Sequence, residues 1–106
     1  MVEVKLTDAA IDDLNKIAEY IAKDSIRYAQ ITVNTLFESV FILEELPYAG
    51  KVVKEFNKPS IRELVRENYR IVYRIVNEHR IDILTFHHSK RSLKRNVAVK
   101  NLKKKK

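Results

Sequence analysis

The stretch from Ile61 to Arg91 has a period-two pattern of apolar residues through three consecutive segments. Alternation is strict from Tyr69 to Val76, and the segment from Ile81 to His88 is rich in β-branched and aromatic residues. Alternate side chains of a strand point to opposite faces, so each segment has one face suited to a core. With turns expected near Glu67-Asn68 and between Asn77 and Arg80, the pattern predicts consecutive antiparallel strands.

The first half of the chain has the helical period instead. The apolar positions of the two runs are Ile11, Leu14, Ile17, Ala18 and Ile21, then Ala29, Val33, Leu36, Phe37, Val40 and Leu43. Thr7 or Asp8 can cap the first run, and Asp24-Ser25 separates it from the second, which ends at Leu46-Pro47. This spacing predicts two amphipathic helices in an antiparallel hairpin.

Two shorter segments complete the expected α+β fold. Residues 2–6 alternate apolar and charged side chains and predict a short N-terminal strand, and residues 51–56 could form an edge strand. We therefore expect an N-terminal strand, a helix hairpin and a three- to four-stranded antiparallel sheet. A single domain would cover residues 1–91, followed by a basic tail, residues 92–106, that is a frayed helix or disordered.

The formal net charge of +7 is concentrated in that tail. Residues 89–106 hold nine of the 21 Lys and Arg and none of the 14 acids, so residues 1–88 carry a net charge of −2. Nucleic-acid binding through phosphates needs clustered cations, which the body of the chain lacks. The excess of lysine near the end is typical of a solvated terminus that acts, if at all, through its charge.

Composition excludes several classes of site. The sequence has no cysteine and only three histidines, which excludes disulfides and thiolate metal sites and gives no ligand spacing for zinc. No apolar run approaches the roughly 18 residues of a membrane span. We expect a cytoplasmic protein that needs no metal or cofactor and does not enter the membrane.

Strand register decides which polar side chains share a face. An even loop between Val76 and Ile81 would oppose Tyr73 to Leu84, Ile71 to Phe86 and Arg70 to His87. A two-residue turn at Glu67-Asn68 would oppose Leu64 to Ile71 and Glu63 to Val72. The core would then take Tyr73, Leu84, Ile71 and Phe86, whereas Ile83 and Thr85 would point away from the helices.

Under this register Glu63, Arg70, Arg74 and His87 share the outer face. A carboxylate, an imidazole and guanidinium groups are the components of a small acid-base site that can hold a phosphate. An odd loop or a bulge would bring His88 to that face instead. The alternative interpretation is that Glu63, Arg70 and Arg74 are cross-strand ion pairs on a solvated face.

Ordered motifs along the chain resemble the RelE/ParE superfamily of bacterial toxins. They are Asp13-Leu14, Ile17 to Asp24, Leu46-Pro47 with Gly50, Ile61 to Leu64, Tyr69 to Tyr73, and His88 to Arg91. The resemblance covers about residues 4–91. It implies the toxin of a type II toxin-antitoxin pair that inhibits growth and that a cognate antitoxin neutralises in a hetero-oligomeric complex.

The two branches of the superfamily imply different targets. RelE-like members are ribosome-dependent endoribonucleases that cut mRNA; Arg70 matches their central-strand arginine, with His87 or His88 as the acid-base residue and Glu63 as a possible base. Ser89 stands where some relatives have a tyrosine.

ParE-like members act on DNA gyrase, and the long helix hairpin and the ending His88 to Arg91 resemble them more closely. Candidate target-binding residues are then Arg74, Arg91, Lys94 and Arg95. We favour this branch. A third possibility is a non-toxic binding module on the same fold.

Overall fold

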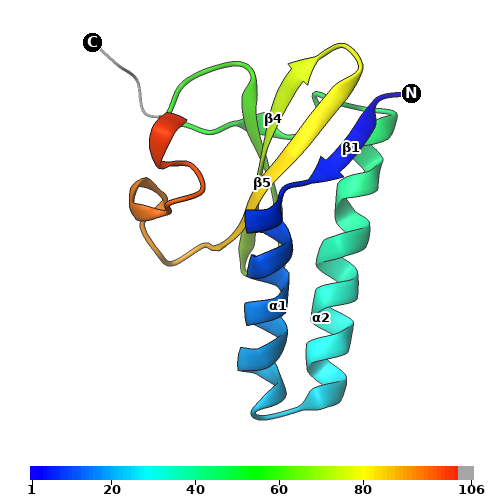
Figure 1. The fold of residues 1–106 in the computed structure, drawn as a ribbon, viewed down its shortest axis with the longest axis vertical. Coiled ribbons are helices and arrows are strands. Elements are labelled where there is room, and N and C mark those ends of the chain that lie inside the picture. The colour runs from blue at the N-terminus through cyan, green and yellow to red at the C-terminus, as the bar shows by residue number, and fades with distance from the viewer. Residues whose placement is uncertain (103–106) are drawn as a thin grey trace.

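A computed structural model describes residues 1–102. The last four lysines of the predicted basic tail, residues 103–106, lie outside the described residues. The strands are β1 (Glu3–Leu6), β2 (Lys51–Val52), β3 (Ile61–Arg66), β4 (Tyr69–Asn77) and β5 (Arg80–His88). The helices are α1 (Asp8–Ala22) and α2 (Ile26–Ser39), with short 3₁₀ helices at Val40–Glu44, Leu93–Arg95 and Lys100–Leu102. The predicted α+β class is confirmed (Figure 1).

The helix hairpin follows from its caps and its apolar stripe. The Thr7 side chain accepts a hydrogen bond from Ala10 N and begins α1, and the Ser25 side chain accepts one from Tyr28 N and begins α2. The predicted stripes are buried or partly buried except at Ile11 and Phe37, which are 47% and 43% exposed. The two helices run side by side on one face of the sheet (Figure 1).

The sheet has five strands in the order β1-β5-β4-β3-β2. β2 to β5 are antiparallel, as the sequence predicts, and β1 adds a parallel strand against Arg80 to Ile83 of β5. The sheet is therefore mixed and has one strand more than expected. Because β1 ends at Leu6, the rest of the β5 edge is left for other partners.

The register between β3 and β4 is as predicted, with Leu64 opposite Ile71 and Glu63 opposite Val72. Between β4 and β5 the predicted pairs Ile71–Phe86 and Arg70–His87 are also confirmed.

The predicted pairs Tyr73–Leu84 and Val76–Ile81 are wrong, because Tyr73 lies opposite Ile83 and Ile75 opposite Ile81. Two register shifts cause this, one on each strand. The first displaces the pairing by one residue after Val72, and the second restores the predicted register at Asn77.

The shifts distribute apolar side chains between two cores. Ile83, expected on the outer face, lies in the core under the helices together with Tyr73, and Leu84 instead packs against a second cluster on the outer face. That second cluster contains Val53, Phe56, Ile61, Val72, Leu93, Val99 and Leu102. The face of the sheet opposite the helices is therefore covered by apolar side chains.

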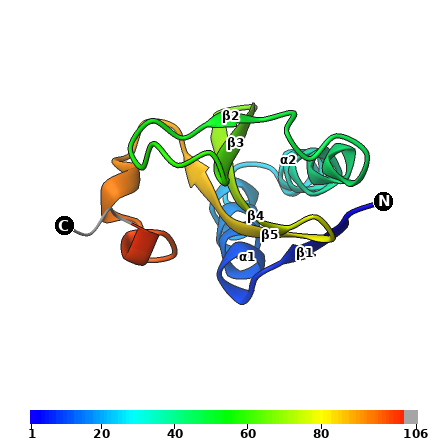
Figure 2. The same ribbon diagram turned by 90° about the horizontal axis from the view of Figure 1, so that it is seen from above.

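The C-terminal segment, residues 93–102, provides much of that cover. Leu93 and Val99 are at most 1% exposed and Leu102 is 8% exposed. The expected frayed helix or disordered tail thus includes, in its described part, two 3₁₀ turns whose apolar residues pack on the sheet. Figure 2 shows these turns and the helix hairpin on different sides of the sheet. Over residues 1–102, no helix has the length and apolarity to cross a membrane.

Candidate functional site

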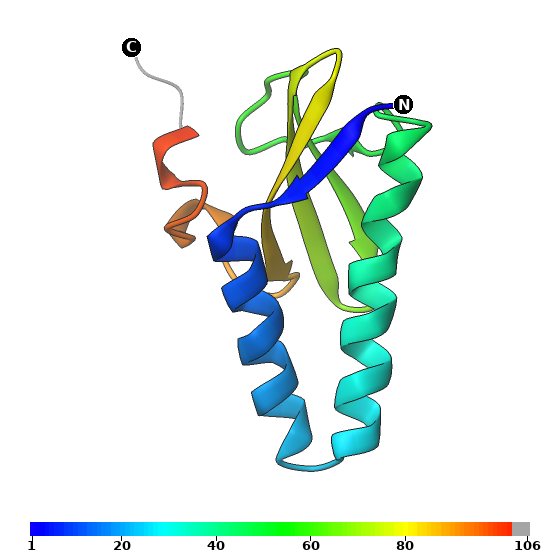
Figure 3. The same ribbon diagram turned by 45° about the vertical axis from the view of Figure 1, so that its right-hand side comes forward.

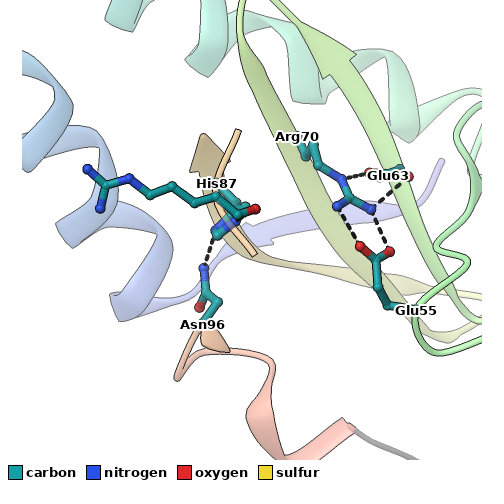
Figure 4. A network of polar contacts seen from close by, with 6 residues as sticks. Glu55, Glu63, Arg70, His87 and Asn96 are labelled. Carbon is teal, nitrogen blue, oxygen red and sulfur yellow. Dashed lines mark hydrogen bonds and ion pairs between the residues drawn. The ribbon is translucent and has the colours of Figure 1, made fainter. Parts of the chain in front are cut away.

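Arg70 is the centre of an ion cluster on the outer face. Its Nη1 and Nη2 atoms each lie 2.8 Å from a carboxylate oxygen of Glu55, and Nε and Nη2 contact the two oxygens of Glu63 (Figure 4). Glu63 is 4% exposed, so loss of this pairing would leave a buried carboxylate without its cation. The hydrogen bonds from Arg70 lower the pKa of Glu55 to about 2, and the two carboxylates raise the pKa of Arg70.

The acid–arginine cluster, Glu55, Glu63 and Arg70, also joins three parts of the fold. Glu63 is in β3, Arg70 in β4, and Glu55 in the connection that follows β2. All three nitrogen atoms of the guanidinium group donate to carboxylates within the chain. The group is therefore already bidentately bound in the way that it would hold a phosphate.

His87 is buried, and both of its ring nitrogens have partners. Asn96 Oδ1 accepts from Ala98 N at 2.8 Å, which fixes the amide so that its Nδ2 faces His87 Nδ1 at 2.9 Å. Nδ1 is then an acceptor, and the Nε2–H donates to Arg91 O at 3.0 Å. With one ring nitrogen accepting and the other donating within the chain, no nitrogen is left for a substrate.

A chain of hydrogen bonds continues from Asn96 to α1. Asn96 Nδ2 also lies 3.1 Å from Thr85 Oγ1, and Thr85 in turn donates to the Asp13 carboxylate. Asp13 accepts from Phe86 N at 3.1 Å as well, at the β5 edge that β1 does not cover. Burial raises the pKa of Asp13, opposed by the hydrogen bonds from Thr85 and Phe86. This network ties the C-terminal segment, β5 and α1 together.

The predicted site residues do not form one cluster. Arg70 and His87 are opposed in register, but Figure 4 shows the Arg70 side chain directed to Glu55 and Glu63 and the His87 side chain directed to Asn96. His88 is half-buried, accepts from Lys90 N through Nδ1, and packs edge to face on Tyr69. Glu55 and Asn96 were missed, and Asp13 was named only within a family motif and given no role in the site. Isolated polar residues in loops or on the outer side of a helix follow no period that would place them at the site.

A groove of about 1110 Å³ lies between the helix hairpin and the end of β5. Its lining includes apolar residues of α1 and β5, three tyrosines, and the bases Lys16, Lys90, Arg91 and Arg95. Of the predicted target-binding residues, Arg91 and Arg95 line the groove, whereas Arg74 and Lys94 are not part of its lining. Arg74 lies further along β4, opposite Asp82.

Comparison with known proteins gives one family and several similar folds. A family model described as "ParE toxin of type II toxin-antitoxin system, parDE" matches residues 4–93. No curated protein sequence matches.

Among solved structures, one of a chromosomal ParDE system from P. aeruginosa is 24% identical, with a TM-score of 0.70, and the match covers 85% of this chain and 98% of that one. The toxin-antitoxin complex RelBE2 from Mycobacterium tuberculosis contains a chain that is 27% identical, with a TM-score of 0.56, covering 82% of this chain and 96% of that one.

Proposed function

Because the chain belongs to the ParE toxin family of type II toxin-antitoxin systems, we propose that it inhibits growth by acting on DNA gyrase, and that it does not cut mRNA. The ParE-like ending and helix hairpin favour this target. The observation that argues against mRNA cleavage is the hydrogen bonding of the polar residues on the outer face of the sheet. The residues that an endoribonuclease would use there are bonded within the chain.

Arg70 supports this choice most strongly. A guanidinium group that stabilises a phosphorane must be able to face the phosphate, and the Arg70 group is taken by Glu55 and Glu63. Binding RNA at this position would bring a phosphate beside two carboxylates, one of them nearly fully buried. Repulsion between like charges disfavours that arrangement.

The histidines support it as well. His87, the one opposite Arg70, would have to break its bond to Asn96 or to Arg91 O before it could exchange a proton with a ribose hydroxyl. Val72 and the C-terminal segment lie in the apolar cluster that covers this face. We therefore assign structural roles to Glu63, Arg70 and His87, and place target contacts at Arg91 and Arg95, which are exposed.

We propose a cognate antitoxin as the physiological partner. Two similar solved structures are described as toxin-antitoxin systems or complexes, ParDE and RelBE2. An antitoxin that covers the groove would mask Arg91 and Arg95, which we expect to contact the target.

The test uses purified toxin freed of antitoxin. We expect it to reduce supercoiling, or to produce cleaved plasmid, when it is added to gyrase, ATP and plasmid DNA. In a translating extract the same preparation should leave mRNA intact. Discrete mRNA cuts with unaltered gyrase activity would overturn the proposal, and unaffected growth on induction would favour a non-toxic binding module.

A further inference from the structure

Residues 89–102 carry five cationic side chains and no acidic one. All five are exposed, and none forms an ion pair within the described chain, residues 1–102. They are Lys90, Arg91, Lys94, Arg95 and Lys100. Because no carboxylate of the chain neutralises these cations, their charge is available to a partner in solution.

The C-terminal segment that carries most of these cations is folded onto the sheet. Leu93 and Val99 lie in the outer-face cluster, and Asn96 is hydrogen-bonded to side chains of β5. Lys94 and Arg95 lie between two of these anchored residues. A fixed backbone loses less conformational freedom on binding than a flexible chain end does. The positive charge is therefore presented by a structured surface.

The loop after β2 adds a further cation beside this segment. Val53 and Phe56 of the loop belong to the same apolar cluster as the C-terminal segment, so the two lie side by side (Figure 2). Lys54 is exposed and forms no ion pair within residues 1–102. The neighbouring carboxylate, Glu55, is bonded to Arg70. The loop thus extends the positive surface across the outer face.

Negative charge is concentrated on the other side of the molecule. Residues 1–50, which include β1 and both helices, hold nine acids and four bases. The helix hairpin and the C-terminal turns lie on different sides of the sheet (Figure 2). The charge is therefore polarised across the sheet, so a polyanion would be attracted to the C-terminal side and repelled from the hairpin side.

The composition of the positive surface favours the phosphates of duplex DNA as its ligand. Four of the six cations are lysines, which are depleted in protein–protein interfaces but commonly contact phosphates. In residues 51–58 and 89–102 the only aromatic residue is Phe56, which is 3% exposed. Unpaired bases of a single strand would therefore have no side chain to stack on. Contacts to the backbone alone suit a duplex.

We propose that this basic surface binds the phosphate backbone of the duplex DNA that gyrase holds. The surface consists of the six exposed cations described above, Lys54, Lys90, Arg91, Lys94, Arg95 and Lys100. The inference rests on the proposed action on gyrase. Contacts to DNA and to protein reinforce each other, so the toxin binds gyrase with DNA more tightly than either alone. The acid–arginine cluster has two carboxylates and one guanidinium group, so its net negative charge keeps the duplex away from Arg70.

The first experiment measures binding of the full-length toxin to a labelled DNA duplex of mixed sequence by fluorescence anisotropy. The double variant Lys94→Gln/Lys100→Gln removes two charges from the basic surface. We expect it to bind the duplex about tenfold more weakly at low salt. The slope of log affinity against log salt concentration should become shallower by about 2, since each lysine that contacts a phosphate contributes about 1.

The matched control, Lys23→Gln/Arg27→Gln, removes the same charge at the tip of the helix hairpin. These residues are exposed and lie between or near the adjoining ends of α1 and α2, remote from the C-terminal turns (Figure 3). DNA affinity should stay within about twofold of the wild type, because salt screens a distant charge. All four substituted residues are exposed, so neither double variant should impair folding. Equal DNA affinity of the two double variants would overturn the proposal.

A second experiment distinguishes DNA from protein as the partner of the surface. The same toxins are bound to gyrase alone and to gyrase with plasmid DNA. We expect Lys94→Gln/Lys100→Gln to weaken binding to gyrase with DNA and to leave binding to gyrase alone unchanged. Equal losses in the two measurements would assign the surface to a protein contact and contradict the proposal.

The four terminal lysines are tested in the duplex assay by replacing Lys103 to Lys106 with glutamine. This toxin should still bind the duplex, and Lys94→Gln/Lys100→Gln should still weaken that binding. A toxin that no longer binds would assign DNA binding to the end of the chain, against the proposal.

The two assays also separate this inference from the proposed target. Duplex binding is measured without gyrase, so wild-type toxin that binds DNA as expected but leaves gyrase activity unaltered would contradict the target alone. Gyrase inhibition by the wild type, with Lys94→Gln/Lys100→Gln and its control equal in DNA affinity, would contradict the basic surface alone.

Discussion

Arg70 of β4 and His87 of β5 lie directly opposite each other in the sheet, yet Arg70 is bonded to Glu55 and Glu63, and His87 to Asn96 and the Arg91 carbonyl. Opposed strand positions bring an arginine and a histidine close enough to suggest a shared site. Their bonds instead fasten two different segments, the loop after β2 and the C-terminal segment, onto the outer face.

Replacing Arg70 should lower the free energy of unfolding. Arg70→Ala leaves Glu63, which is 4% exposed, without its cation. Removal of one partner of a buried ion pair typically costs about 3–5 kcal/mol. Urea unfolding measures the change, with Lys54→Ala, an exposed neighbour of Glu55, as a control expected to stay within about 0.5 kcal/mol. A loss below about 1 kcal/mol would show that the acid–arginine cluster is not structural.

The Glu55 contribution should depend on pH. Its pKa falls from 4.5 to about 2 on folding, so the folded state favours the ionised carboxylate, and this stabilisation is complete above pH 4.5 and is lost as pH falls toward 2. Glu55→Gln should therefore be less stable than the wild type near neutral pH, by about 1–3 kcal/mol. The difference should shrink in acid. Unfolding curves across this range check it, and a difference that is the same at all pH values would argue against the ion pair.

Gly50 should not tolerate a side chain. A Cβ at this position would lie 2.5 Å from Glu63 O and 2.7 Å from the Tyr73 hydroxyl, which accepts from Gly50 N and donates to Pro47 O. Gly50→Ala should therefore cost about 1–3 kcal/mol through crowding. Thermal unfolding tests this against Ala49→Ser, a change at the exposed neighbouring residue. Equal melting temperatures for the two variants would show that the loop moves aside freely.

Asn96 should hold the C-terminal segment in place. Asn96→Ala removes the bonds to Thr85 Oγ1 and His87 Nδ1 and the acceptor for Ala98 N. Hydrogen exchange should then become faster at Val99 N and Leu102 N, which are bonded within the segment. Val97→Ala, at a residue that is 80% exposed, is the control and should leave exchange unchanged. Unaltered protection in Asn96→Ala would mean that Leu93, Val99 and Leu102 suffice to hold the segment.

Local patterns predicted the helix hairpin and four of the six strand pairs named from the sequence. The stripes of α1 and α2 follow from the helical period, and the turn at Glu67-Asn68 sets the β3–β4 pairs, with Glu67 in the left-handed region at φ 56°. No local sequence pattern predicts the register shifts between β4 and β5. They place Ile83 under the helices and Leu84 against the outer-face cluster, and that preference exists only once both cores have formed.

The sequence placed Glu63, Arg70 and His87 on one face but did not indicate their partners. Glu55 lies in a loop and Asn96 in a lysine-rich stretch, where no period relates a residue to the sheet. Leu93, Val99 and Leu102 have irregular spacing among basic residues, so their burial depends on an apolar sheet face that only the folded chain presents. The polar residues therefore suggested a catalytic face. In the folded chain this face is packed against other segments.

The most direct test of the account is to examine plasmid DNA and mRNA from the same culture after induction of the toxin without antitoxin. We predict that plasmid loses negative supercoiling or accumulates as cleaved molecules, while mRNA 5′ ends remain those of uninduced cells. Normal plasmid supercoiling together with new mRNA 5′ ends at translated codons would contradict the account.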